Sequence, residues 1–292
     1  MEKTKIIVDT DIGSDIDDAL CFAYLLNEPC CELLGVTTCS SEPEKRAEIV
    51  DSLCRYISKD IPIFVGRDMP LIGLQRQVAV HQYSVLEKLP HKTDFIKNTA
   101  ISFMKETIEK YPHEVVILAI GPLTNVGALF SAYPHLASLV KEVAVMGGSF
   151  FEEGHAFLKQ EFNILNDAYS AEILFNSGAK ITIGGLDVSL RTKTSAKEFL
   201  SKEHTGINKA LALYVEKFTE RTDDMYYHDA IPALYLFDKD IVKIKKGKVS
   251  IGLKDKDFAY TYFTECEDGN VNVMCDIDVE RFFDRYNKIV KG

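Results

Sequence analysis

Five aspartates gather within ten residues near the start of the sequence, at Asp9, Asp11, Asp15, Asp17 and Asp18. They directly follow the apolar residues 6–8, which predicts that they leave the end of a buried strand. Neighbouring anions repel each other, so gathering them costs free energy unless a cation or protons offset the repulsion. Hard divalent cations such as Ca²⁺ and Mg²⁺ prefer oxygen ligands. The spacing therefore predicts a turn that holds a metal ion and grips a substrate.

Three other interpretations account for the acidic turn less well. An EF-hand loop needs glycine at its sixth position and an acidic residue at its twelfth, and these positions are Ser14 and Leu20 here. A phosphatase of the Asp-x-Asp-x-Thr type has Thr or Val where Gly13 stands, and its downstream lysine and acidic pair cannot be assigned. A capping cluster at a helix N-terminus accounts for about two of the five aspartates.

The elements that must position this turn alternate between strands and helices. Val- and Ile-rich runs predict strands at residues 5–9, 33–38, 61–66, 114–120, 142–148 and 180–186. Segments of helical length separate them at residues 17–27, 43–58, 95–110, 123–133 and 167–177. This alternation predicts an α/β fold with an open, mostly parallel central sheet flanked by helices. Such sheets bind ligands at the carboxyl ends of their strands, where the acidic turn would lie.

The last third of the sequence has a different pattern. Residues 207–220 and 230–238 predict helices, residues 248–253, 258–263 and 271–277 predict short strands, and residues 279–290 predict a final amphipathic helix. These strands form a small antiparallel C-terminal extension of the expected fold. No linker or repeat separates a second unit, so residues 1–292 are expected to form a single domain.

Composition limits the partners. A net charge of −10 disfavours nucleic acid and anionic membranes as partners. The seven cysteines include no C-x-x-C pair, so a thiolate zinc site is not indicated. With no signal peptide and no long apolar run, a cytoplasmic protein with free thiols is expected.

Several further motifs follow the acidic turn. They are Gly-Pro-Leu-Thr-Asn at residues 121–125, Met-Gly-Gly at 146–148, Glu-Phe-Asn at 161–163 with Asp167, and His-Asp at 228–229. In this order, and with the closing segment 276–290, the sequence resembles the inosine-uridine preferring nucleoside hydrolase family. The resemblance implies a Rossmann-like nucleoside hydrolase fold and a homodimer or homotetramer. It also implies Ca²⁺-dependent hydrolysis of the N-glycosidic bond of ribonucleosides to ribose and free base.

The resemblance also assigns residues. It implies that Ca²⁺ is held by Asp11, Asp18, the main-chain carbonyl of Thr124 and Asp229, and that Asp11 is the base for a metal-activated water. The residues expected at the substrate are Asp15, Asp17, Met146, His155, Glu161, Phe162 and Asn163, with Glu161 and Asn163 on ribose hydroxyls. His228 is a packing histidine or, on the sharper interpretation, the general acid that protonates the leaving base.

The acidic turn departs from the family pattern by two residues. If the Asp-Asp-Ala segments are aligned, Asp17 matches the ribose-binding aspartate and Asp18 the metal ligand, and Asp15 becomes an extra pocket residue. Without the gap, Asp15 takes the ribose position and Ile16 the ligand position, which a hard metal would not choose. The gapped alignment is preferred.

Other departures concern the substrate. The family's Gly-Asn after the second strand is Ser41-Glu42 here, and its Asn six residues before Glu161 is His155. The chain has no Trp, whereas purine-specific members stack the base between tryptophans, so pyrimidine or broad specificity is favoured. Candidates for the base side are Phe150, Phe151, Phe157 and His81. The rival functions are a metal-dependent phosphohydrolase and a non-catalytic nucleoside- or sugar-binding protein.

Overall fold

A nine-stranded sheet runs through the protein, described by a computed structural model for residues 3–77, 79–151 and 159–290. The strand order is β10-β9-β11-β6-β5-β4-β1-β2-β3. Their bounds are β1 Thr4–Thr10, β2 Cys31–Thr38, β3 Ile63–Val65, β4 Val115–Ala119, β5 Glu142–Met146, β6 Ile181–Gly184, β9 Val242–Ile251, β10 Thr261–Glu265 and β11 Val271–Ile277. Two further short strands, β7 (Thr194–Ser195) and β8 (Asp224–Met225), pair separately.

The sheet is parallel from β3 to β11 and antiparallel at one edge. β11 pairs parallel with β6, whereas β9 and β10 add antiparallel strands beyond it. The predicted α/β class and mostly parallel open sheet are thus confirmed. The antiparallel C-terminal strands continue the main sheet.

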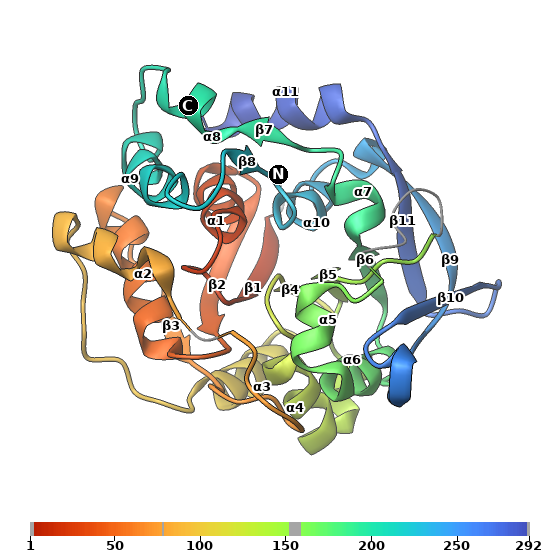
Figure 1. Ribbon diagram of the computed structural model, residues 1–292. Coiled ribbons are helices and arrows are strands. Elements are labelled where there is room, and N and C mark those ends of the chain that lie inside the picture. The colour runs from red at the N-terminus through yellow and green to blue at the C-terminus, as the bar shows by residue number, and fades with distance from the viewer. Residues whose placement is uncertain (1–2, 78, 152–158, 291–292) are drawn as a thin grey trace.

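Helices cover both faces of the sheet (Figure 1). α1, α9, α10 and α11 lie on one side and α3, α4, α5 and α6 on the other. The helices are α1 Asp17–Asn27, α2 Pro43–Tyr56, α3 Ala100–Lys110, α4 Thr124–Ala132, α5 Phe162–Asn166, α6 Ala168–Phe175, α7 Leu186–Ser189, α8 Ala196–Leu200, α9 Asn208–Phe218, α10 Ala230–Tyr235 and α11 Val279–Val290, with 3-10 turns at His81–Lys88, Pro134–Ser138, Lys239–Ile241 and Asp255–Asp257. None of the helices in the described part of the chain has the length and apolar character to span a membrane.

The central strand β1 shows why the sheet is buried on both faces. Its residues alternate between two cores, with Ile6 and Val8 packing beneath α1 and Ile7 packing beneath α3 and α4. All three side chains are fully buried. Burying each contributes about 1.5–3 kcal/mol, which explains why apolar residues continue along the strand without polar alternation.

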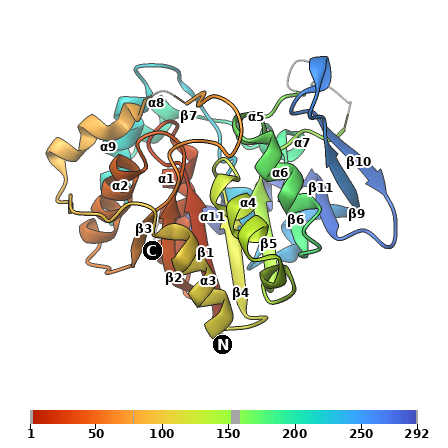
Figure 2. The same ribbon diagram turned by 90° about the horizontal axis from the view of Figure 1, so that it is seen from below.

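The strand ends bring distant motifs together. Asp9, at the carboxyl end of β1, pairs with Thr37 of β2 and with Ala119 of β4. Met146 ends β5, two positions along the sheet from β1. Figure 2 shows β1, β4 and β5 from a second direction. The acidic turn and the motifs after β4 and β5 therefore meet at one edge of the sheet, as predicted.

Candidate active site

The acidic turn alternates between core and cavity. Ile12 and Ile16 are fully buried and anchor the turn in the core beneath α1. Gly13 has φ +110°, and a Cβ there would lie 2.6 Å from both Ile49 Cδ1 and Val80 Cγ1, so only glycine fits. These anchors leave Asp15, which lies between them, and Asp11 and Asp17, which flank them, facing the cavity.

Thr10 ties the strand end to the helix that follows. Its hydroxyl oxygen accepts a hydrogen bond from the Ile12 N–H at 3.0 Å, and its O–H donates to Asp18 Oδ1. α1 begins at Asp17, so Asp17 and Asp18 lie in the first helical turn, where the helix dipole favours negative charge. Both carboxylates are therefore fixed at the start of α1 by the local sequence.

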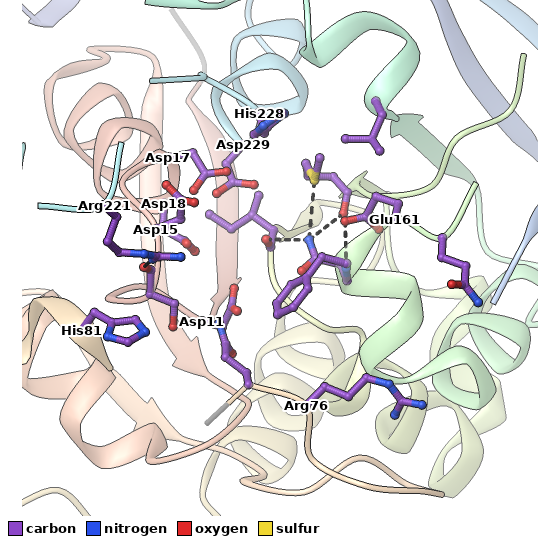
Figure 3. Close-up of a pocket in the computed structure, with 18 of the residues that line it drawn as sticks. Asp11, Asp15, Asp17, Asp18, Arg76, His81, Glu161, Arg221, His228 and Asp229 are labelled. Atoms are coloured by element: carbon purple, nitrogen blue, oxygen red, sulfur yellow. Dashed lines mark hydrogen bonds between the residues drawn. The ribbon is translucent and has the colours of Figure 1, made fainter. Parts of the chain in front are cut away.

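A cavity of about 530 Å³ lies at this edge of the sheet. Its size suits a small organic ligand. Figure 3 shows the carboxylates of Asp17, Asp18 and Asp229 directed toward one another in its wall. The residues that line it are Asp11, Ser14, Asp15, Asp17, Asp18, Arg76, Gln77, Ala79, His81, Ile120, Met146, Gln160, Glu161, Phe162, Asn163, Leu186, Leu190, Arg221, His228 and Asp229.

Three carboxylates form the acidic centre of the cavity. One oxygen from each of Asp17, Asp18 and Asp229 lies within 4.8 Å of the other two. At an effective dielectric constant of 20, two charges at this 4.8 Å spacing repel by about 3.5 kcal/mol. Burial raises the pKa of all three carboxyl groups well above the usual range, and repulsion from neighbouring aspartates, Asp11 and Asp15 included, adds to the shift. A divalent cation would offset the repulsion, and the oxygen-only donor set fits a hard metal.

Asp11 faces the same cavity from outside this group of three. Its carboxylate lies against Gly121, where a Cβ would be 2.8 Å from both Asp11 N and Oδ1. Burial raises the pKa of Asp11, and the positive charge of Arg46 opposes that shift. Thr124, the fourth expected ligand, is buried at the start of α4, and its hydroxyl donates to Asp167 Oδ2 at 2.8 Å. Thr124 is not among the residues that line the cavity.

Glu161 is held by the backbone around it. Its Oε1 accepts from Asn163 N at 2.8 Å, and its Oε2 accepts from Gly148 N and Ile164 N at 3.0 Å. It caps the N-terminus of α5, and burial raises its pKa. The left-handed Gly148 (φ +78°) directs its N–H toward this carboxylate, which explains the Met-Gly-Gly motif.

Asn163 presents its amide oxygen to a ligand. Its Nδ2 donates to the carbonyls of Ile120 at 3.1 Å and Met146 at 3.2 Å. The hydrogen bonds among described residues leave Oδ1 unused, and Asn163 lines the cavity together with Met146 and the half-exposed Phe162. The predicted substrate residues from β5 and α5 are thus brought together in one wall.

His228 lies in the wall next to Asp229. Its Nδ1 is 2.7 Å from Ser189 Oγ, and its ring stacks on Tyr226 at 5.0 Å between centroids. Burial lowers the pKa of His228 to about 4, so the imidazole is neutral at pH 7. The serine contact fixes the orientation of the ring, so Nε2 is the nitrogen left for a ligand.

Asp15 is exposed, at the mouth of the cavity. Its Oδ1 accepts from Ile16 N at 2.7 Å, and the positive charge of Arg221 acts favourably on its carboxylate. Ile16 packs in the core while Asp17 and Asp18 line the cavity, which is the arrangement that the gapped alignment requires. Asp17, which was expected to bind ribose, is itself one of the three carboxylates of the acidic centre.

The residues expected on the base side of the substrate lie in different places. His81 lines the cavity, whereas Phe150 and Phe151 line a neighbouring hollow beside Thr261 and Tyr262. His155 and Phe157 lie outside the described residues.

Sequence reasoning missed Arg46, Gln77 and Arg221. Arg46 shares the spacing of the apolar face of α2, with Ile49, Val50 and Leu53 three, four and seven residues later. An arginine that shares the helical spacing of the apolar residues is expected to lie on the buried face of the helix. Gln77 and Arg221 lie in irregular segments, whose course is not encoded by periodicity.

The sequence and the fold are similar to those of known nucleoside hydrolases. Residues 6–284 match the family model of the inosine-uridine preferring nucleoside hydrolases. Uridine nucleosidase 1 of Arabidopsis thaliana is 31% identical, over 85% of this chain and 78% of that protein. A pyrimidine-specific ribonucleoside hydrolase of Shigella flexneri is 24% identical, over 100% of this chain and 98% of that protein. The solved structure of a purine-preferring ribonucleoside hydrolase from Gardnerella vaginalis superposes with a TM-score of 0.86 and is 23% identical in sequence. The superposition covers 99% of this chain and 98% of that one.

Proposed function

The chain belongs to the inosine-uridine preferring nucleoside hydrolase family, and on this premise we propose that it is a Ca²⁺-dependent ribonucleoside hydrolase. The reaction would release ribose and a free base. The observation that carries the proposal is the group of Asp17, which is partly buried, with the buried Asp18 and Asp229. One oxygen from each lies within 4.8 Å of the other two in a cavity of about 530 Å³.

The acidic residues would hold the ion and bind the sugar. Asp18, Asp229 and Asp11 line one cavity and are the proposed side-chain ligands, together with the Thr124 carbonyl. Asp17 lies close enough to Asp18 and Asp229 to act as a ligand or to accept from a ribose hydroxyl beside the ion. When bound, Ca²⁺ would supply the Lewis acidity that lowers the pKa of a water.

Asp11 is the proposed general base. Its carboxylate faces the cavity, and a carboxylate can accept the proton of the attacking water. Glu161 and the Asn163 amide oxygen would bind ribose hydroxyls from the opposite wall. As the glycosidic bond breaks, positive charge develops on the ribose ring, and these fixed oxygens would stabilise it.

His228 is the proposed leaving-group acid. Its Nε2 is the nitrogen available to a base, since Nδ1 contacts Ser189. Because burial keeps the imidazole neutral at pH 7, the ring must first take up a proton from solvent or from the attacking water. The resulting imidazolium, with hydrogen on both nitrogens, then transfers its Nε2 proton to the departing base and returns to the neutral form.

Pyrimidine nucleosides are the favoured substrates. The chain contains no Trp to sandwich a purine, and the two curated relatives described above are named for uridine or pyrimidine substrates. The structural neighbour named as purine-preferring shares the same fold, so broad specificity stays within the proposal.

The decisive experiment is a nucleoside panel with ribose release as the readout. Uridine, cytidine and inosine are incubated with Ca²⁺ and, separately, with a chelator. Release of ribose with Ca²⁺ and its loss with chelator support the proposal. If p-nitrophenyl phosphate is cleaved and no nucleoside is, the phosphohydrolase alternative is correct. If nucleosides bind without turnover, the protein is a non-catalytic binder.

Quaternary structure and location belong to the same proposal. We infer a homodimer or homotetramer, which light scattering of the purified protein tests directly. A cytoplasmic location and a single domain also stay predictions, the second supported by the one sheet that links both ends of the chain.

A further inference from the structure

Arg46 of α2 is fully buried directly beneath the acidic turn. Its Nη1 donates to the carbonyls of Asp11 and Ile12, and to Ser14 Oγ at 3.1 Å. Its Nε donates to the Ser41 carbonyl at 2.8 Å, and its Nη2 contacts Ser41 Oγ at 3.4 Å. One guanidinium therefore joins the turn after β1 to the loop after β2.

The acceptors of this guanidinium are all neutral. Its five hydrogen bonds go to backbone carbonyls and serine hydroxyls, and in the described part of the chain it forms no ion pair with a carboxylate. A buried charge is costly unless other charges compensate it. The nearest compensation comes from the site itself, because the charge of Arg46 acts on the carboxylates of Asp11 and Asp18.

The contacts of Arg46 coincide with two departures from the family pattern. Ser14 belongs to the segment that is two residues longer than usual, and Ser41 stands where Gly-Asn is common. These positions are far apart in the sequence, yet oxygens of both accept hydrogen bonds from the same side chain. A longer turn has more conformations available, so it needs an added constraint to hold a fixed geometry.

We propose that Arg46 is a positioning residue for the proposed hydrolase, fixing the enlarged acidic turn so that Asp11 and Asp18 face the cavity. It acts through the backbone of the turn and does not touch the substrate. The planar guanidinium group is essential, because its N–H groups donate to several oxygens at fixed angles, which the ammonium group of a lysine cannot do. This inference rests on the proposed function for its kinetic consequences and on geometry alone for its structural ones.

The test compares Arg46→Lys, Arg46→Met and Ser14→Ala with a matched control, Leu53→Ala. Leu53 is fully buried on the same helix and belongs to the core beneath α1, and it does not line the cavity. Leu53→Ala reports the effect of destabilising α2 without altering the turn. Each variant is measured for melting temperature, Ca²⁺ affinity by calorimetry, and kcat and KM with uridine.

Loss of a group that orients metal ligands typically reduces activity or metal affinity about 10–100-fold. We expect losses in this range for Arg46→Lys and Arg46→Met, falling on kcat and Ca²⁺ affinity more than on KM, and a smaller loss for Ser14→Ala. Leu53→Ala should lower the melting temperature and leave kcat near the wild-type value. If Arg46→Lys and Leu53→Ala lose activity only in proportion to their melting temperatures, Arg46 is merely structural.

Hydrogen exchange separates this inference from the proposed function. Amides of residues 12–18 should exchange faster in Arg46→Lys than in wild type, while Leu53→Ala should leave them protected. This readout needs neither Ca²⁺ nor substrate. A wild-type protein that releases no ribose refutes the hydrolase proposal only, whereas unchanged exchange in Arg46→Lys refutes the positioning role.

Discussion

Asp9 shows how strongly environment divides the aspartates of one short turn. Its Oδ1 accepts from Thr37 Oγ1 at 2.6 Å and from Asn125 Nδ2 at 2.8 Å, and among described residues Oδ2 has no partner. Burial raises its pKa to about 7. It does not line the cavity, so it supports the strand end, whereas Asp11 and Asp18 face the ligand. Chemically identical side chains thus acquire separate tasks from their hydrogen bonds and burial.

Replacing Asp11 tests the general base. Asp11→Asn keeps the shape of the side chain but removes its ability to accept a proton. We expect kcat for uridine to fall by at least about 100-fold, the low end of general-base contributions. Binding of ribose should persist, measured by calorimetry, because the opposite wall is intact. Turnover at the wild-type rate would remove Asp11 from this role.

Replacing His228 tests the leaving-group acid. His228→Ala should reduce kcat for inosine much more than kcat for p-nitrophenyl riboside, whose leaving group needs no proton. The expected ratio of the two losses is about 100-fold, the usual contribution of a general acid. Tyr226→Phe serves as the control, since it keeps the stacked ring. Equal losses on both substrates would assign His228 to packing.

At the scale of elements, the buried parallel strands and the helices that follow them were predictable. α1 and α11 have the predicted bounds. α11 is strongly amphipathic, whereas α1 is buried along nearly its whole length and ends just before Pro29. β9 begins at Val242, six residues before the predicted start, because the exposed Lys243, Lys245 and Lys246 interrupt the apolar pattern of its first half. α3 begins at Ala100, five residues later than predicted.

The site was predictable from topology where a motif follows a strand of the parallel sheet. Asp11 and Asp18 reach the cavity after β1, whereas Asp229, Glu161 and Asn163 line it from segments that only the resemblance to the family had assigned. α5 was not predicted, because its five residues are too few for periodicity and Glu161 defines it by capping. The role of Arg46 was missed because it depends on hydrogen-bond acceptors from two loops. Sequence alone does not show that these loops lie next to each other.

The turn after β4 gives a prediction at this scale. In Gly121→Ala the added Cβ would lie 2.8 Å from Asp11 N and Oδ1, so the acidic turn must shift. A shift of about 1 Å at a reacting group can cost about 100-fold in rate, and we expect a loss of that order in kcat. Gly269→Ala, which would clash with Gly247 far from the cavity, is the control for general destabilisation. Wild-type kcat in Gly121→Ala would contradict this account.

For the whole molecule, Ca²⁺ and protons should compete for the acidic centre. The raised carboxyl pKa values mean that the folded protein without metal binds protons more tightly than the unfolded chain. Its stability therefore falls as pH rises above about 4, the unfolded value, and through the raised folded values. Ca²⁺ needs the ionised forms, so its stabilisation grows over the same range.

This linkage can be measured by melting curves between pH 5 and 8, with Ca²⁺ or with chelator. The difference in melting temperature should widen with pH. At a Ca²⁺ concentration 100 times the Kd, the stabilisation should reach about 2.7 kcal/mol. Asp229→Asn is expected to narrow the difference at every pH. If the difference in melting temperature with and without Ca²⁺ is constant from pH 5 to 8, Ca²⁺ and protons do not compete for the acidic centre.

Helix α11 carries a consequence for how the protein is made. The Tyr286 hydroxyl donates to the Leu20 carbonyl at 3.0 Å, and Arg285 Nη2 contacts Glu28 at 2.7 Å. The helix that begins with Asp17 and Asp18 is thus braced by residues synthesised more than 250 positions later. A nascent chain therefore exposes the acidic turn well before it receives this brace. The proposed ion-binding centre should mature only once α11 has been synthesised, and chains that stall or terminate before α11 should be unable to retain Ca²⁺.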